Sequence, residues 1–89
     1  MKYFTEEELR ILNNYYGTAC NLRHILLNLF NQDTFPRVRL RAVLCCADEK
    51  HKELFWKILD TPLEYLDGCE IHEDIDYLRE SNKNIDWIH

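Results

Sequence analysis

Glycine and proline are scarce in this chain, which has two of each among its 89 residues. So few breakers argue against a disordered or loop-rich protein. Neither G-x-x-x-x-G-K nor G-x-G-x-x-G occurs, so the glycine-rich backbone that cradles phosphates or forms an oxyanion site is missing. The only serine, Ser81, stands in a polar stretch without the context of a catalytic triad. We therefore expect no enzymatic activity.

Long apolar runs are also missing. No stretch approaches the ~20 apolar residues of a membrane-spanning helix, and MKYFTEEELR has no apolar run behind its lysine, as a secretory signal would. We expect a cytoplasmic protein without a membrane partner. In that compartment free thiols are more common than a disulfide framework. The cysteines concerned are Cys20, Cys45, Cys46 and Cys69.

The motif C-x-x-C is absent, but two Cys/His pairs keep a zinc site open as an alternative. Cys20 and His24 stand four residues apart in a predicted helix, and Cys69 and His72 form C-x-x-H near a turn. Two thiolates and two imidazoles are a sufficient set for tetrahedral zinc. Nothing in the pattern brings the two pairs together. We therefore expect buried thiols, surface imidazoles, and no metal or other cofactor.

Residues 5–31 carry the clearest pattern in the chain. Two opposed stripes, one apolar and one polar, recur there at alternating steps of three and four residues, which predicts an amphipathic helix. The apolar stripe consists of Leu12, Tyr15, Ala19, Leu22, Leu26 and Leu29. Thr5 and Glu8 form the S/T-x-x-E capping box of a helix start. Gly17 lies in the polar stripe and predicts a bend or break, because glycine costs about 1 kcal/mol relative to alanine inside a helix.

Residues 37–45 fit two structures. Three arginines alternate there with apolar residues, which is the period of a half-buried strand. The stretch also carries an apolar stripe at helical spacing, and Pro36 with Thr34 as N-cap is typical of a helix start. We favour the helix and keep the strand as the alternative.

The second half of the chain favours short helices. An apolar face from Leu54 to Leu59 predicts a helix that Asp48 can cap and that Thr61-Pro62 ends. Residues 63–66 predict one further turn, and residues 73–81 predict a last helix. Over residues 1–89 we therefore expect one helical domain. Its fold class is all-α, a small bundle of three to five helices, and α+β is the alternative if the strand near 37–45 forms.

Charge is distributed unevenly along the chain. Residues 1–59 hold nine Lys/Arg and seven Asp/Glu, whereas residues 60–89 hold two and nine. Dense carboxylates beside exposed aromatic residues suit a protein that occupies a basic, nucleic-acid-binding groove on a target, because complementary potentials speed association. A tryptophan on a charged helix face is typical of an interface anchor; the alternative is that the C-terminal tail with Trp87 covers it. The residues expected to contact a partner are Trp56, Glu70, Glu73, Asp74, Asp76, Tyr77, Glu80 and Trp87.

These features predict a non-enzymatic, acidic protein-binding module that occludes a basic surface on a heterologous protein. Small inhibitors, antitoxins, immunity-type proteins and phage or mobile-element accessory proteins are of this kind. One alternative is a nucleic-acid-binding module that uses Arg37, Arg39 and Arg41, unless these arginines pair with the acidic C-terminal third. Another is a self-associating structural protein, in which the apolar seam from Leu12 to Leu29 faces a second copy in a homodimer.

Overall fold

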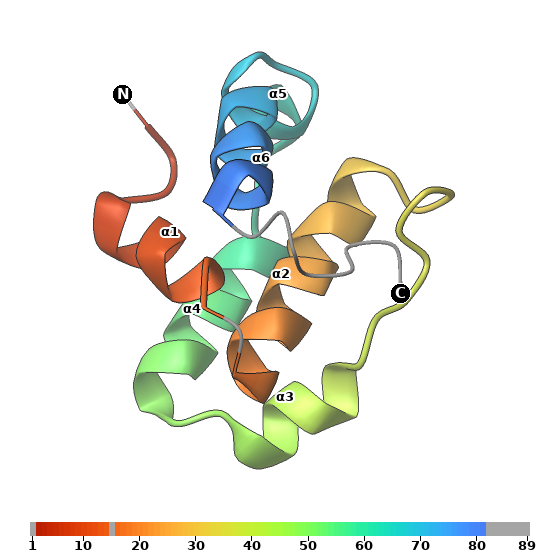
Figure 1. The fold of residues 1–89 in the computed structure, drawn as a ribbon. Coiled ribbons are helices and arrows are strands. Elements are labelled where there is room, and N and C mark those ends of the chain that lie inside the picture. Colours follow the sequence, from red (N-terminus) through yellow and green to blue (C-terminus); the bar gives the residue numbers. More distant parts are fainter. Residues whose placement is uncertain (1, 15, 82–89) are drawn as a thin grey trace.

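The described part of the chain folds into six helices and contains no strand (Figure 1). The computed structural model describes residues 2–14 and 16–81, and for residues 79–81 it describes the backbone only. The helices are α1 (Glu6–Leu12), α2 (Gly17–Phe30), α3 (Leu40–Cys46), α4 (Glu49–Leu59), α5 (Leu63–Leu66) and α6 (Glu70–Ser81). The predicted all-α class is confirmed, whereas the expected number of three to five helices is too low.

The amphipathic stretch 5–31 forms two helices instead of one. α1 ends at Leu12 and α2 begins at Gly17, so the chain breaks where the glycine predicts a bend or break. The capping box is present: the Thr5 hydroxyl accepts from the Glu8 N–H at 3.1 Å, and the Glu8 carboxylate accepts from the Thr5 N–H at 2.8 Å. These bonds satisfy two backbone donors near the start of α1.

A buried arginine closes the break between α1 and α2. Only 1% of Arg23 is exposed, and its Nη1 donates to the carbonyls of Leu12 and Asn14, each at 2.6 Å. Carbonyls at the end of a helix lack intrahelical partners. The guanidinium supplies these partners from α2 and thereby fixes the turn between the two helices.

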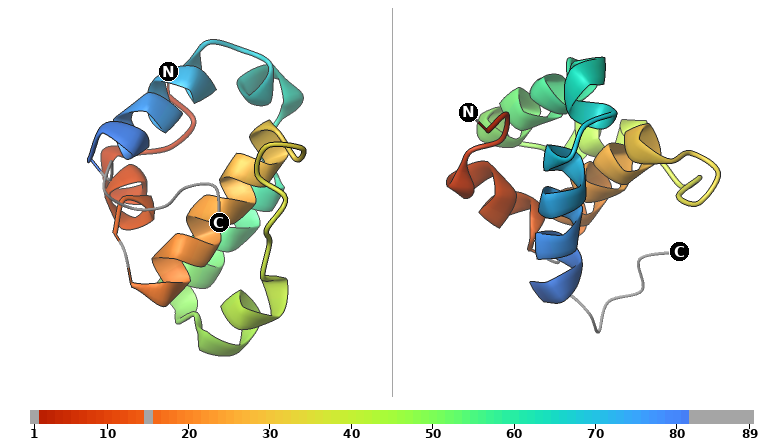
Figure 2. Two further views of the ribbon diagram at one scale, coloured as in Figure 1. Left: turned by 45° about the vertical axis from the view of Figure 1, so that its right-hand side comes forward. Right: turned by 90° about the horizontal axis from the view of Figure 1, so that it is seen from above.

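α2 lies at the centre of the fold, where it packs against α1, α3 and α4 (Figure 2). α6 packs against α1 and α5. The fully buried members of the predicted apolar stripe are Leu12, Ala19, Leu22 and Leu26. Leu29 is 37% exposed, and Tyr15 lies outside the described residues. The protein's own core therefore covers these four residues of the seam, while Leu29 stays partly exposed.

Residues 37–45 do not form the alternative strand, and the helix there starts later than predicted. α3 begins at Leu40, and the predicted N-cap Thr34 is six residues away from it. The Asn31 side chain accepts from the Thr34 N–H at 3.1 Å and holds that residue in the turn after α2. Residues between this turn and Leu40 run as an irregular connection.

The second half follows the predicted helix boundaries closely. Asp48 caps α4, because its carboxylate accepts from the His51 N–H at 2.9 Å. α4 ends at Leu59, just before the expected stop at Thr61-Pro62, and α5 is the single further turn that the sequence predicts. α6 begins at Glu70, three residues earlier than expected. None of the helices in the described part is both long and apolar enough to cross a membrane.

Candidate partner-binding surface

Trp56 stands on the outer face of α4, where 60% of its surface is exposed. The opposite face of this helix is buried in the core through Leu54, Phe55 and Ile58. The Phe55 ring contacts the indole in an edge arrangement, with the ring centroids 5.1 Å apart. A helix fixed by its buried face therefore presents the indole to solvent.

Three charged residues share this face with Trp56. Glu49, Lys52 and Glu53 precede the tryptophan by seven, four and three residues, which places all four side chains on one side of α4. Together they line a shallow hollow of about 380 Å³, named here the α4 hollow. Neither Glu49 nor Glu53 forms an ion pair with another described residue. Their charges are therefore available to a ligand.

A second hollow, of about 160 Å³, lies where α6 meets α1. Glu73 and Tyr77 line it from α6, whereas Glu6 and Arg10 line it from α1. Tyr77 is 44% exposed, and its neighbour in sequence, Asp76, is exposed as well. The fold thus brings carboxylates from two distant parts of the sequence to one place.

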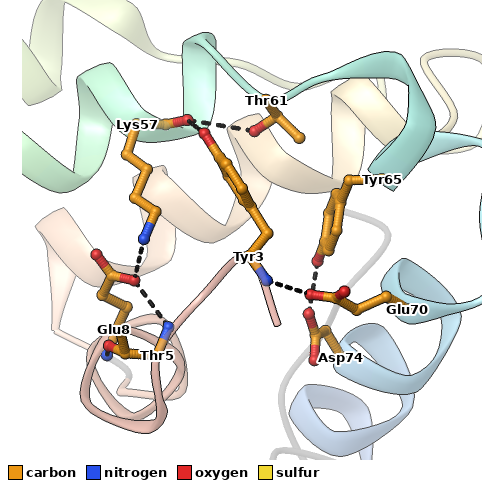
Figure 3. A network of polar contacts seen from close by, with 8 residues as sticks. All are labelled: Tyr3, Thr5, Glu8, Lys57, Thr61, Tyr65, Glu70 and Asp74. Atoms are coloured by element: carbon orange, nitrogen blue, oxygen red, sulfur yellow. Dashed lines mark hydrogen bonds and ion pairs between the residues drawn. The ribbon is translucent and has the colours of Figure 1, made fainter. Parts of the chain in front are cut away.

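Asp74 also lines this hollow, but only 2% of it is exposed, so it offers little surface to a partner. Its carboxylate accepts a hydrogen bond from the Tyr65 hydroxyl at 2.7 Å (Figure 3). Burial raises the pKa of the Asp74 carboxyl above its ordinary value and outweighs the lowering effect of that hydrogen bond. Burial and the same hydrogen bond also raise the pKa of the Tyr65 phenol. The pair joins α5 to α6 inside the protein.

Glu70 is half-buried and takes part in a polar network around the N-terminal segment (Figure 3). Its carboxylate accepts from the Tyr3 N–H at 2.5 Å, and the Tyr3 hydroxyl donates to the Lys57 carbonyl at 2.8 Å. Lys57 also pairs with Glu8 of α1 at 2.7 Å. Glu70 therefore helps to hold α4 and α6 together through Tyr3, and its carboxylate is already engaged.

The predicted contact residues fall on two separate surfaces. The hollows at Trp56 and at Tyr77 share no lining residue. Glu80 lies in α6, but its side chain is outside the described residues, as is the whole of Trp87.

A third hollow lies between α1 and α4, and two of its carboxylates are already paired. Glu7 forms an ion pair with Lys50, and Glu8 forms one with Lys57. Glu53 lines both this hollow and the α4 hollow. Glu49 and Glu53, the two carboxylates beside Trp56, have no cationic partner among the described residues.

Three exposed carboxylates beside these surfaces were not among the predicted contacts. Helical spacing does predict Glu49 and Glu53 on the side of the helix that carries Trp56, although they were not counted among the contact residues. Glu6 could not be predicted in this way, because only the packing of α1 against α6 brings it to Glu73.

Arg37, Arg39 and Arg41 are all exposed, and no carboxylate among the described residues forms an ion pair with them. The pairing with the acidic C-terminal third that was considered above is therefore not formed within the described part. His24 lies near this basic stretch: its pKa is lowered first by burial and then by the charges of Arg23, Arg37 and Arg39. The arginines thus form a positive surface that is separate from the acidic hollows.

A phenol, an imidazole and a carboxylate form a hydrogen-bonded chain between α2 and α4. His51 Nε2 lies 2.6 Å from the Tyr16 hydroxyl, and His51 Nδ1 lies 2.6 Å from Asp48 Oδ1. A nucleophile, its base and an orienting acid follow the same order. However, burial and the Asp48 charge raise the pKa of the Tyr16 phenol, which is the opposite of activation. We interpret this chain as a clamp between the N-terminal ends of α2 and α4.

All four cysteines are free, and Cys45, Cys46 and Cys69 are exposed, so the expectation of buried thiols is wrong for these three. Cys20 is partly buried, with its sulfur 3.2 Å from Arg23 Nη2. Within the part of the chain that the structure describes, no three His, Cys, Asp or Glu side chains are grouped so that they could hold a metal ion. The zinc site considered above is not assembled from these residues.

Comparisons with protein-family models, curated proteins and solved structures find no match for this chain. What its surfaces offer to a ligand follows from their residues. The α4 hollow presents an indole, two carboxylates and one lysine, so its charged residues are mainly acidic. The hollow between α1 and α6 presents a phenol ring beside carboxylates and the cations Lys2 and Arg10, so its charge is mixed.

Proposed function

We propose that this protein is a non-enzymatic binding module that covers a basic surface on a heterologous protein, in the manner of a small cytoplasmic inhibitor, antitoxin or immunity-type protein. An accessory protein of a phage or mobile element acts in the same way. The observation that carries the proposal is Trp56, exposed on a helix whose other face is fixed in the core. Tryptophan is enriched among the few residues that dominate binding energy in interfaces.

Charge selects the partner in this proposal. The protein has a net charge of −5, and Glu49 and Glu53 flank the indole without a cationic partner among the described residues. Complementary charge speeds the encounter with a basic protein and disfavours an acidic one. Glu73, Asp76 and Tyr77 extend the contact, and we assign Glu80 and Trp87 to the same role.

The test places a photo-crosslinking amino acid at position 56 and, as a control, at the exposed position Gln32 in the loop after α2. Both variants are irradiated in cells that express the protein, and the products are identified by mass spectrometry. We expect one basic protein crosslinked from position 56 and not from position 32. Identical products from both positions, or none from position 56, would contradict the proposal.

Binding to the crosslinked partner is then measured with purified proteins. Trp56→Ala should weaken the complex by at least about tenfold, which is typical of an anchor residue, and should leave the melting temperature unchanged because the indole is exposed. Leu44→Ala, a truncation of an exposed residue on α3, is the matched control and should change neither quantity. An affinity for the W56A variant equal to that of L44A would remove Trp56 from the interface.

A second candidate function is nucleic-acid binding by Arg37, Arg39 and Arg41. The observation that favours it is their exposure without an ion pair to a described residue. Phosphate contacts are strongest at low salt, so binding to generic DNA or RNA should be detectable there and should fall as salt is added. No binding at low salt would exclude this candidate.

A further inference from the structure

The α4 hollow has the size and the chemistry of a site for a single cationic side chain. Its volume of about 380 Å³ is at the small end of the roughly 300–1,000 Å³ of ligand pockets. One of its lining residues is Trp56, and the face of an indole attracts cations through the quadrupole of its π-system. The other residues along the same face of α4 include two carboxylates, Glu49 and Glu53, one helical turn apart.

We propose that this hollow receives an arginine side chain of the partner, with the guanidinium stacked on Trp56 and paired with Glu53 and Glu49. The inference rests on the proposed function, and it names the group that the surface recognises. A guanidinium is planar, stacks on aromatic faces and forks toward a carboxylate, whereas the lysine ammonium is a compact and strongly hydrated point charge. A site with an indole and carboxylates side by side therefore favours arginine over lysine.

The state of the carboxylates distinguishes this hollow from its neighbour. In the hollow between α1 and α4, Glu7 and Glu8 are paired with lysines of the protein itself. Glu49 and Glu53 are exposed and form no such pair with a described residue. A guanidinium that enters the α4 hollow thus replaces water, and it need not break an existing ion pair between described residues.

Lys52 provides an internal check on the proposal. It lines the same hollow, four residues before Trp56, and its ammonium repels a bound cation. Removing its charge should therefore strengthen arginine binding, whereas a residue that only supports the fold would have no such effect.

The probe is a short glycine peptide with one central arginine, together with its lysine and citrulline analogues. Binding is followed by the emission of Trp56 in a Trp87→Phe background, which leaves one tryptophan in the protein. We expect a saturable change with the arginine peptide, a weaker one with the lysine peptide, and none with citrulline, which lacks the positive charge. Equal responses to arginine and citrulline would overturn the inference.

Variants locate the binding. Glu49→Gln with Glu53→Gln should weaken the arginine peptide by at least about threefold, the size expected for exposed ion pairs, and Lys52→Gln should strengthen it. The matched control, Asp33→Asn with Glu64→Gln, removes the same charge from exposed positions outside the α4 hollow and should leave the affinity unchanged. If the control pair weakens binding as much as the α4 pair, the effect is one of net charge and the inference is wrong.

The two proposals fail separately. If a partner is crosslinked from position 56 but the α4 hollow does not prefer arginine over citrulline, the proposed function stands and the arginine site is wrong. Absence of a crosslinked partner removes the proposed function, and the peptide titration still decides what the hollow binds.

Discussion

Asp74 and Arg23 are charged residues whose roles are set by burial. Asp74 lies among five other carboxylates between Glu64 and Asp76, which share its charge but not its environment. Tyr65 donates to it inside the protein, and the lost hydration of the carboxylate raises its pKa. Arg23 is buried as well and donates to the backbone at the end of α1. Both residues therefore form hydrogen bonds that support the fold.

The raised pKa of Asp74 predicts a specific pH dependence. The folded protein binds the Asp74 proton more tightly than the unfolded chain does. Protonation of Asp74 therefore stabilises the fold at pH values below 3.8, the ordinary pKa of an aspartate. This stability is lost as the pH rises through the pKa of Asp74 in the folded protein. In Asp74→Asn this loss should be absent. The free energy of unfolding in urea, measured across the acidic range, checks this prediction. Asp76→Asn, at an exposed position, is the control. The same pH dependence of stability in D74N and in the wild type would contradict the prediction.

Replacing Arg23 by methionine should destabilise the protein by about 2–4 kcal/mol, because buried backbone acceptors then lose a charged donor. The acceptors are the carbonyls of Leu12 and Asn14. The free energy of unfolding in urea measures the loss. Arg41→Met, at an exposed position, should cost little, and a loss in R23M no larger than in R41M would show that the guanidinium does not support the turn.

At the scale of elements, the helix starts that have a side-chain cap lie where the sequence predicts them. Thr5 caps α1 and Asp48 caps α4 through their own side chains. α3 has no side-chain cap, and the sequence misplaces its start. A capping bond depends on residues within one turn, so sequence spacing predicts it. The start of α3 depends instead on how the preceding loop packs.

The cap at Asp48 also positions the clamp to α2. Asp48→Ala removes the bond to the His51 N–H and the bond to the His51 ring, which faces Tyr16. We expect a loss of about 1 kcal/mol or more, since a lost N-cap typically costs that amount. Thermal unfolding measures it. Asp48→Asn keeps an accepting oxygen at the cap and should recover most of the loss; a D48N variant as unstable as D48A would contradict the role of the cap.

At the scale of the whole molecule, the N-terminal segment is part of the core. Phe4 is buried, and its ring contacts those of Tyr3 and Tyr65 with centroids 4.9 and 5.5 Å away. Tyr3 reaches the Lys57 carbonyl in α4 and the Glu70 carboxylate at the start of α6. The segment therefore links elements that are far apart in the sequence.

Truncation of Phe4 to alanine should destabilise the whole fold by about 3–5 kcal/mol, the usual cost of removing a buried phenylalanine. Urea unfolding provides the total, and amide exchange should show faster opening in α6. Leu63→Ala removes an exposed side chain of α5 and should change neither. A small loss in F4A, similar to that in L63A, would mean that the N-terminal segment does not belong to the cooperative core.

The carboxylates show what sequence could predict about the surface and what it could not. Exposure of Glu73 and Asp76 agrees with their polar pattern, and the position of Glu49 and Glu53 beside Trp56 follows from helical spacing. The burial of Asp74 was not predictable. On α6 it is next to the exposed Glu73 and two positions before the exposed Asp76. The packing of α5, which brings Tyr65 to Asp74, decides which of these carboxylates loses its water.

The sequence by itself determined the helices that carry local signals. These signals are the periodic stripes, the two caps, the break at Gly17 and the stop at Pro62. They act over one or two turns, because local interactions need no partner from elsewhere in the chain. Tertiary structure decided which charges remain exposed and which surfaces adjoin. The burial of Arg23, the meeting of Glu6 with Glu73 and the isolation of Arg37 from carboxylates each depend on residues that are distant in sequence. Desolvation and charge pairing act through space, so they depend on which residues the fold brings together and not on their order in the sequence.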